Sequence, residues 1–194
     1  IFLEELYRQA AKNRDVDVNL RYGNFYKLIS TLTEQGIYAT NLLNKYNEEE
    51  IEAFEKQLDP QRDLLFNYLG IHTIASRYLA TDHNKNVMEL PQERWMIIAM
   101  YLMQDEDKAQ RAQLVQEAYW ALSNLYMTVA TPTLTNAGKT HGQLSSCFID
   151  TVDDSLQSIY DSNTDIAKLS KNGGGIGVYM GKIRSRGSAI KGFK

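Results

Sequence analysis

The clearest indication of the fold class comes from residues 147–183, which read CFIDTVDDSLQSIYDSNTDIAKLSKNGGGIGVYMGKI. The apolar start at Cys147 predicts a short buried strand, and the helical spacing of the later apolar residues predicts a helix capped by Asp153 or Asp154. Glycines end that helix, and residues 176–183 are a candidate second strand. A strand, a helix and a strand in this order predict a β-α-β unit.

The residues before this unit have a different character. Residues 1–127 place apolar side chains at helical spacing, with Asn47 as a predicted helix cap and Pro91 at the start of a helix that we expect to be buried. After this region, β-branched residues around Pro132 favour extended backbone. The sequence therefore predicts a helical region over residues 1–127 and an α/β region over residues 128–194.

The composition narrows the class of protein. The chain has 194 residues, of which 43% are hydrophobic and 23% charged, and its net charge is -3. This balance is typical of a globular protein and argues against a general nucleic-acid binder. The longest apolar run is far shorter than the ~20 residues of a membrane-spanning helix, so we expect a cytoplasmic protein that contacts no membrane. A single cysteine excludes an internal disulfide, and three scattered histidines argue against a metal site.

The charges are unevenly distributed along the chain. Residues 171–194 contain six Lys or Arg residues and no Asp or Glu. A basic segment of this kind either holds a polyphosphate by charge-assisted hydrogen bonds or is a solvated loop. The glycines at 173–177 do not match a known nucleotide-binding fingerprint. They allow either the close approach of an anion or the tight packing of a helix against a strand.

The cysteine and the paired aspartates also have two possible roles each. Cys147 is either an inert buried residue or a reactive thiol, and no neighbouring His or Lys in the sequence indicates activation. Asp153 and Asp154 are either helix caps or acceptors for sugar hydroxyls. The residue types alone do not decide between these alternatives.

Seven short segments follow one another in the last third of the chain. They are Thr131-Pro132-Thr133, Asn136-Ala137-Gly138, Leu144-Ser145-Ser146-Cys147-Phe148, Asp154-Ser155-Leu156, Ser170-Lys171, residues 173–177, and Ile183-Arg184 followed by Gly187-Ser188. In this order they resemble the large (alpha) subunit of ribonucleotide reductase. Residues 19–25 and the helices after them look like the helical region that precedes the ten-stranded α/β barrel of that family. The resemblance implies an N-terminal fragment of a class I large subunit, with a mostly α region followed by the first β-α-β elements of the barrel.

The resemblance implies radical-based reduction of ribonucleotides to deoxyribonucleotides. Cys147 matches the first of two redox cysteines, which delivers a proton to the departing 2'-hydroxyl and forms a disulfide with a cysteine beyond residue 194. Thr131, Ser146 and Gly175 match substrate-binding positions. A thiol in a dry pocket stays protonated and able to donate, which agrees with the expected buried strand.

The resemblance also implies an allosteric specificity site at a homodimer interface, where a deoxynucleoside triphosphate or ATP binds. The implied partners are a ribonucleoside diphosphate substrate, a metal-containing small subunit that generates the radical, thioredoxin or glutaredoxin, and a second copy of the chain. No cofactor is expected in the chain itself. The matching effector positions are Asp154, Ser155, Leu156, Lys171, Arg184, Lys191 and Gly192.

Two other functions share some of these features. A cobalamin-dependent ribonucleotide reductase has a similar cysteine strand and glycine turn, although the N-terminal helices look more like class I. A non-catalytic deoxynucleotide-binding module would also explain the basic segment. Because the remaining catalytic residues of the family lie outside these 194 residues, we expect the chain alone to be inactive.

Overall fold

The computed structural model describes residues 1–190. Contacts between Cα atoms divide the chain into two compact units, Ile1–Gly142 and Gln143–Lys194, each of which is described by itself. The domain boundary expected between residues 127 and 128 rests on sequence character and stays a prediction.

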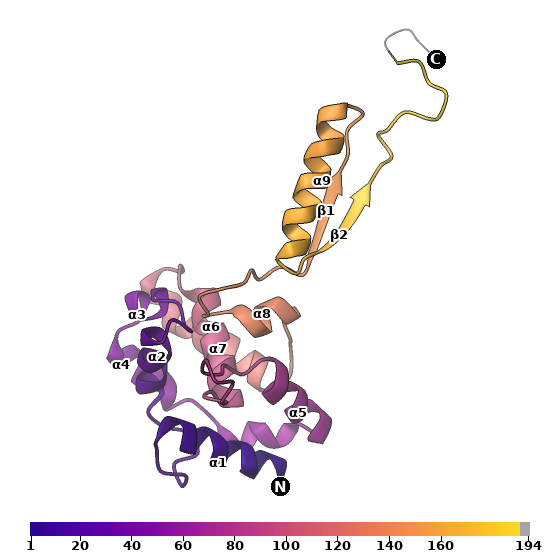
Figure 1. The fold of residues 1–194 in the computed structure, drawn as a ribbon. Helices are drawn as coiled ribbons and strands as arrows, with labels where there is room; N and C mark the ends of the chain where they lie inside the picture. Colours follow the sequence, from indigo (N-terminus) through magenta and orange to yellow (C-terminus); the bar gives the residue numbers. More distant parts are fainter. Residues whose placement is uncertain (191–194) are drawn as a thin grey trace. The chain divides into compact units, whose positions relative to one another are not determined.

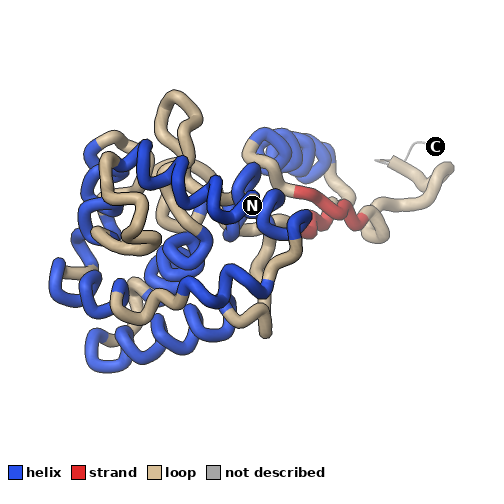
Figure 2. Tube along the Cα trace, turned by 90° about the horizontal axis from the view of Figure 1, so that it is seen from below, coloured by secondary structure: helices blue, strands red, loops and turns tan. Residues whose placement is uncertain are grey.

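The first unit is built from helices, which Figure 2 shows in blue with loops in tan. Among the described residues, strands occur only in the second unit, apart from two isolated bridges. The expectation of a mostly helical N-terminal region is confirmed. The elements are α1 (Phe2–Arg14), α2 (Phe25–Glu34), α3 (Asn41–Lys45), α4 (Glu48–Glu55), the 3-10 helix η1 (Pro60–Leu65), α5 (Tyr68–Arg77), α6 (Pro91–Met103), α7 (Lys108–Ser123) and α8 (Thr131–Asn136).

Helix α6 forms the centre of the first unit. Pro91 lies in its first turn, where the missing N–H costs no hydrogen bond, and every residue from Pro91 to Met100 is buried. α6 packs against α7 and also contacts η1 and α8 (Figure 1). A helix that is enclosed on all sides needs apolar residues around its whole circumference, which the run from Trp95 to Met100 supplies. The expected buried helix at Pro91 is confirmed.

Local sequence signals explain several helix starts. The Asn47 side chain accepts a hydrogen bond from the Glu50 N–H at 2.8 Å, and the Glu50 side chain accepts one from the Asn47 N–H at 2.9 Å. The predicted cap at Asn47 is confirmed. The expectation of extended backbone around Pro132 is wrong, because residues 131–136 form α8 with Pro132 in its first turn. A proline at this position needs no intrahelical hydrogen bond, and its fixed φ angle suits a helix.

A buried ion pair joins α1 to α6. Arg14 Nη1 donates to Glu93 Oε1 at 2.8 Å and to Oε2 at 3.0 Å, while Arg14 Nη2 donates to the Gly23 carbonyl at 2.8 Å. The Glu93 side chain is fully buried and also accepts a hydrogen bond from the Leu90 N–H at 2.8 Å. Burial raises the pKa of Glu93 to about 7, and the neighbouring Arg14 offsets this effect only in part.

A second buried carboxylate, Asp63, links α1, η1 and α6. The hydroxyls of Tyr7 and Tyr22 each donate to Asp63 Oδ2 at 2.6 Å, and Gln92 Nε2 donates to Oδ1 at 2.7 Å. Burial raises the pKa of Asp63, although these three hydrogen bonds act in the opposite direction. Both buried carboxylates therefore hold their protons more tightly in the folded chain.

We expect Glu93 to make the fold less stable as the pH rises from about 5 to 7. The pKa of Glu93 is about 7 in the folded chain, against an ordinary value of 4.5. Between these values the folded state binds more protons than the unfolded state, so the free energy of unfolding falls with increasing pH. Glu93→Gln is expected to remove this contribution, which is on the order of 3 kcal/mol across the window. Urea unfolding at several pH values measures the slope.

Asp63 provides an internal comparison for the pH dependence of the free energy of unfolding of Glu93→Gln. Asp63 remains in Glu93→Gln and titrates in the same direction, so a shallower slope should persist. A slope equal to that of the unaltered chain would contradict the role given to Glu93. Below pH 7 Glu93 is mostly protonated, so Glu93→Gln removes little charge from beside Arg14 in this window. The cost of leaving Arg14 without a partner charge arises only as the pH rises above about 7.

The second unit is a parallel β-α-β unit. Strands β1 (Cys147–Thr151) and β2 (Gly175–Tyr179) pair in parallel, and α9 (Leu156–Lys171) connects them. Figure 1 shows α9 alongside both strands, which it contacts. The predicted β-α-β order is confirmed, and with the helices before it the fold agrees with a helical region followed by the start of a barrel.

The second strand is shorter than the sequence suggests. β2 ends at Tyr179 and does not extend over residues 180–183. The Ile183 N–H donates to the Met180 carbonyl at 3.1 Å, which closes a turn at this point. Residues 180–190 therefore form a loop, and this loop carries Lys182, Arg184 and Arg186 of the basic segment.

Candidate functional site

Three of the predicted site residues meet at the start of the two strands. Cys147 and Gly175 are partners in the parallel register. The Gly175 N–H donates to the Ser146 carbonyl at 2.8 Å. The Ser146 hydroxyl lies 3.3 Å from Cys147 Sγ, where either group can be the donor. The pairing of the strands therefore places Ser146, Cys147 and Gly175 in one cluster.

The register also leaves space beside the cysteine. Side chains alternate along a strand, so Cys147 and Ile149 share the face on which their partners are Gly175 and Gly177. Neither glycine has a side chain to cover this face. A molecule that approaches the thiol would meet bare backbone at both partner positions.

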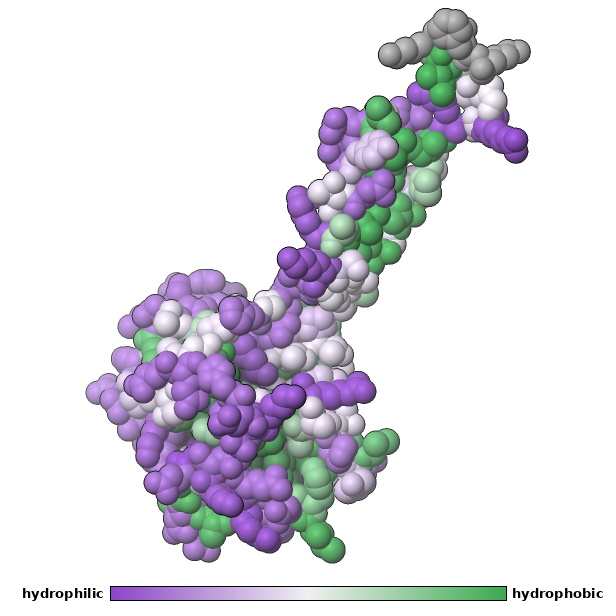
Figure 3. All heavy atoms as spheres, viewed as in Figure 1, coloured by the Kyte–Doolittle hydropathy of each residue, from purple (hydrophilic) through white to green (hydrophobic). Residues whose placement is uncertain are grey.

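The face with Cys147 is open to solvent. Cys147 is exposed and Ile149 is 87% exposed, whereas Phe148 and Ile176 are partly buried. The expectation of a buried strand is wrong for the described residues, because parallel strands need cover on both faces and one helix supplies only one. Figure 3 shows a band of hydrophobic atoms, in green, along the side of the second unit that faces the viewer.

Two neighbouring glycines of the cluster have different surroundings. Gly174 is packed tightly against other atoms, whereas Gly175 lies beside open space. A Cβ added to Gly174 would lie 2.7 Å from Phe148 Cε2 and 3.2 Å from the Leu169 carbonyl oxygen. Only glycine lets the strand pass this close to the aromatic ring. A Cβ added to Gly175 would meet nothing closer than the Ser146 carbonyl oxygen at 3.4 Å. The tight-packing explanation therefore holds at Gly174, while Gly175 lies on the open face.

Two ion pairs lie at the other end of the strands. Lys182 Nζ is 2.8 Å from Asp153 Oδ1, and Arg184 Nε is 2.6 Å from Asp154 Oδ2. Arg184 Nη1 also donates to the Ala189 carbonyl at 3.0 Å. The carboxyl ends of parallel strands share one edge of a sheet, so the residues after β1 and after β2 are neighbours.

The first turn of α9 carries two further effector candidates. The Ser155 hydroxyl accepts a hydrogen bond from the Ser158 N–H at 3.1 Å, so Ser155 is the helix cap and the expected cap at Asp153 or Asp154 is wrong. A serine that directly precedes the helix competes successfully because its short side chain reaches the free N–H groups. Leu156 is 74% exposed.

The other predicted residues belong to other parts of the chain. Lys171 ends α9 and is about 22 Å from Leu156 by the helical rise. Thr131 begins α8 in the first unit, where it is exposed and its carbonyl accepts a hydrogen bond from the Thr135 hydroxyl at 2.9 Å. Lys191 and Gly192 lie outside the described residues.

The ion pair between Lys182 and Asp153 was not predicted from the sequence. The signal that could have found them is topological, since an acidic pair that follows one parallel strand and a Lys-x-Arg sequence that follows the next must lie at the same sheet edge. The partners are separated by 29 residues, so neither composition nor spacing reveals the contact.

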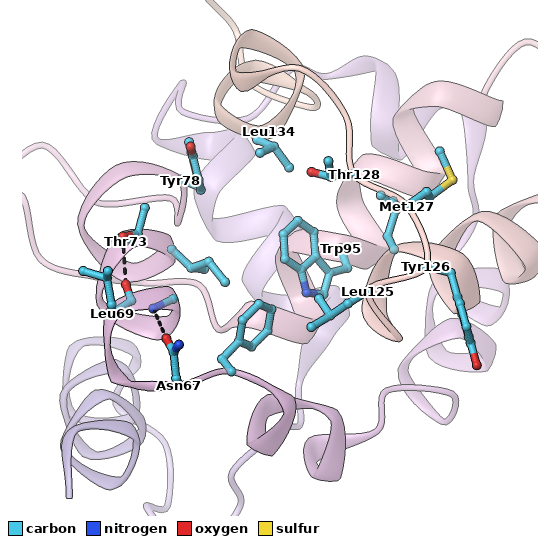
Figure 4. A pocket seen from close by; sticks show the side chains of 14 residues that line it. Asn67, Leu69, Thr73, Tyr78, Trp95, Leu125, Tyr126, Met127, Thr128 and Leu134 are labelled. Atoms are coloured by element: carbon cyan, nitrogen blue, oxygen red, sulfur yellow. Dashed lines mark hydrogen bonds between the residues drawn. The ribbon is translucent and has the colours of Figure 1, made fainter.

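A pocket in the first unit contains none of the predicted site residues. It has a volume of about 660 Å³ and lies between α5, α6 and the segment after α7. Figure 4 shows the Trp95 ring in the middle of its mostly apolar lining, with Leu125 and Leu134 nearby. Its two drawn hydrogen bonds, from Thr73 to Leu69 and from Gly70 to Asn67, stay within α5 and its cap.

The described part of the chain contains neither a membrane-spanning helix nor a grouped set of metal ligands. No helix between residues 1 and 190 is long and apolar enough to cross a lipid bilayer. Over the same residues, no three or more His, Cys, Asp or Glu side chains are grouped as ligands for a metal ion.

A helical unit followed by a parallel β-α-β unit, with a cysteine at the first strand and charged pairs at the strand ends, places the chain among the proteins that combine helices with a parallel sheet. The family profile of the ribonucleotide reductase all-alpha domain matches residues 64–142, and the profile of the ribonucleotide reductase barrel domain matches residues 145–194. The chain belongs to the ribonucleotide reductase large-subunit family. The resemblance inferred from the sequence motifs is confirmed.

Relatives named as ribonucleoside-diphosphate reductase subunits match 90% or more of the chain. It is 43% identical over 175 residues to the ribonucleoside-diphosphate reductase subunit alpha of Treponema pallidum, which is 90% of this chain and 21% of the relative. It is 40% identical over 194 residues to the subunit alpha of Helicobacter pylori, which is 100% of this chain and 23% of the relative. It is also 37% identical over 177 residues to the large subunit of Monkeypox virus, with 90% of this chain and 21% of the relative covered.

The chain thus spans about a fifth of the length of the curated relatives it matches. These relatives are named as diphosphate reductases, and their names give no support to the cobalamin-dependent alternative.

Proposed function

We propose that this chain is part of the large subunit of a class I ribonucleoside-diphosphate reductase, which makes deoxyribonucleotides for DNA synthesis. The observation that carries the proposal is the cluster of Ser146 and Cys147 beside Gly175, on a sheet face with no side chains at the partner positions. In this cluster the thiol lies beside glycine backbone, which a ribose could approach closely because no side chain is in the way.

Cys147 acts as a reductant toward the ribose in this proposal. Its thiol gives a proton to the departing 2'-hydroxyl, which leaves as water. Cys147 and a second cysteine outside these residues supply two electrons and are oxidised to a disulfide, while the 2'-carbon gains a hydrogen in place of oxygen. Thioredoxin or glutaredoxin then reduces the disulfide.

Thr131, Ser146 and Gly175 hold the substrate. Hydroxyl groups and an open glycine backbone suit the diphosphate and ribose of a ribonucleoside diphosphate, because both offer hydrogen bonds without bulk. Thr131 is exposed at the start of α8, so its side chain is accessible for this role. The radical that starts the reaction is supplied by a separate metal-containing small subunit, and the complex works in the cytoplasm.

The specificity site lies at the carboxyl ends of the strands. Asp154, Ser155 and Leu156 lie there together with Arg184, and a carboxylate beside a guanidinium suits a sugar hydroxyl and a phosphate. We assign Lys171, Lys191 and Gly192 to the same site, which takes a deoxynucleoside triphosphate or ATP.

The position of Lys171 favours a homodimer. Within one chain it is about 22 Å along α9 from Leu156, too far to reach the same triphosphate. A second copy whose α9 runs antiparallel to the first would bring its own Lys171 to the Asp154 end of the helix. The effector would then lie between two copies of α9.

The test is the formation of dCDP from CDP by the full-length protein with its small subunit, thioredoxin and a deoxynucleoside triphosphate effector. We expect turnover that depends on all of these components. The 194 residues alone are expected to give none, because they span about a fifth of the relatives. Absence of turnover by the full-length protein with every component present would contradict the proposed activity.

A further inference from the structure

We propose that Lys182 is an additional phosphate-binding residue of the specificity site, and that Asp153 competes with the effector for it. The inference rests on the proposed site at the strand ends. In the structure Lys182 Nζ is 2.8 Å from Asp153 Oδ1, one residue before the predicted site residue Asp154. Neither Lys182 nor Asp153 is among the positions that the family resemblance assigns to the effector.

The two ion pairs at the strand ends join the segment before α9 to the segment after β2. Asp153 and Asp154 are adjacent before α9, and Lys182 and Arg184 follow β2 two residues apart. Each aspartate contacts one cation, at 2.8 Å and 2.6 Å. Because both cations follow β2 and both acids precede α9, we expect a polyphosphate that binds Arg184 to reach Lys182 as well. Lys182 and Arg184 would then form one phosphate-binding surface.

A phosphate group can replace the Asp153 carboxylate as the partner of Lys182. The side chains of Lys182 and Asp153 are 56% and 63% exposed, so a competing anion can reach the ammonium group from solvent. An ion pair this exposed contributes little to stability because water screens it. A triphosphate carries several charges and many acceptor oxygens, so it forms stronger charge-assisted hydrogen bonds than one carboxylate. We therefore expect the triphosphate to displace Asp153.

Arg184 differs from Lys182 in how firmly it is held. Its guanidinium contacts both Asp154 and the Ala189 carbonyl, which keeps the loop from Arg184 to Ala189 closed. Lys182 has a flexible stem and a single point charge that can turn between partners. Lys182 is thus the residue that moves on binding, while Arg184 stays in place.

The experiment measures the affinity of the full-length protein for dTTP by isothermal titration calorimetry. The variants are Lys182→Met, Asp153→Asn and the double variant. We expect Lys182→Met to weaken binding about five- to tenfold, since one charge-assisted hydrogen bond is lost. Asp153→Asn is expected to strengthen binding about two- to fivefold because the competing carboxylate is removed. The double variant is expected to bind like Lys182→Met alone.

The double variant separates competition from simple repulsion. If Asp153 only repelled the triphosphate at a distance, its replacement would strengthen binding equally with or without Lys182. Such an additive result would overturn the proposed competition. Lys45→Met is a matched control, because Lys45 forms a similarly exposed ion pair with Asp105 at 2.7 Å in the first unit and is not among the proposed site residues.

The outcomes also distinguish this inference from the proposed function. Wild-type binding of dTTP that is lost in Arg184→Ala but unchanged in Lys182→Met would support the specificity site and overturn the role of Lys182. No binding of dTTP by the wild-type protein would overturn both. Circular dichroism of each variant checks that the fold is kept.

Discussion

Replacing Cys147 with serine in the full-length protein, assayed with its small subunit and thioredoxin, is expected to abolish deoxyribonucleotide formation while leaving dTTP binding intact. Serine has nearly the same shape, but its hydroxyl cannot be oxidised to a disulfide, so the two electrons for the ribose are no longer available. The loss is expected to be roughly 10³-fold or more, the scale seen when an essential reacting group is removed. Product formation from CDP, together with dTTP affinity, measures both parts.

A matched control is available on the same strand face. Thr151 lies four residues along β1 and is also exposed, so Thr151→Ser tests a small side-chain change without touching the thiol. We expect this control to keep its activity. Turnover by Cys147→Ser close to the wild-type rate would show that Cys147 is not a reductant. It would favour the alternative of a non-catalytic deoxynucleotide-binding module for these residues.

Replacing Gly138 with alanine is expected to lower the free energy of unfolding by about 2 to 5 kcal/mol. Gly138 has a φ of +79°, and a Cβ there would lie 2.6 Å from Ile97 Cγ2 and 3.2 Å from Leu42 Cδ1. The left-handed backbone costs an alanine about 1 to 2 kcal/mol. Overpacking against Ile97, in the fully buried centre of α6, adds about 1 to 3 kcal/mol.

Gly36 separates these two contributions. It has a φ of +71°, and a Cβ at this position would have nothing within 4 Å, so Gly36→Ala carries the backbone cost alone. Urea unfolding of both variants is expected to show a loss of about 1 to 2 kcal/mol for Gly36→Ala and a larger one for Gly138→Ala. Equal losses would mean that the space around Ile97 relaxes freely.

The sequence predicts the features that depend on neighbouring residues. Asn47 was expected to cap a helix because an asparagine followed by glutamates satisfies free N–H groups locally, and the structure has this cap. The β-α-β order followed from the spacing of apolar residues and glycines. The expected extended backbone at Pro132 failed because the same proline also suits the first turn of a helix, and local propensity does not distinguish the two.

The features that were missed depend on distant residues. Glu93 looks like an ordinary acid near a helix start, but it is buried against Arg14, which is 79 residues away in sequence. The site residues were inferred from a family resemblance, and the structure describes Ser146, Cys147 and Gly175 as one cluster. The partner of Lys182 could not be predicted because only the parallel pairing of the strands brings the loops at their ends together.

The unequal burial of the two units sets an order of events during synthesis. The first unit has a continuous core around α6, whereas in residues 143–190 only Val152 and Ser162 are buried, and Val178 and Met180 remain exposed. A ribosome delivers residues 1–142 first, so the helices can close around α6 while the strands are still emerging. By itself the β-α-β unit leaves the face with Cys147 and Ile149 uncovered. While this face is open, its apolar surface is where a chaperone would be most useful to the growing chain.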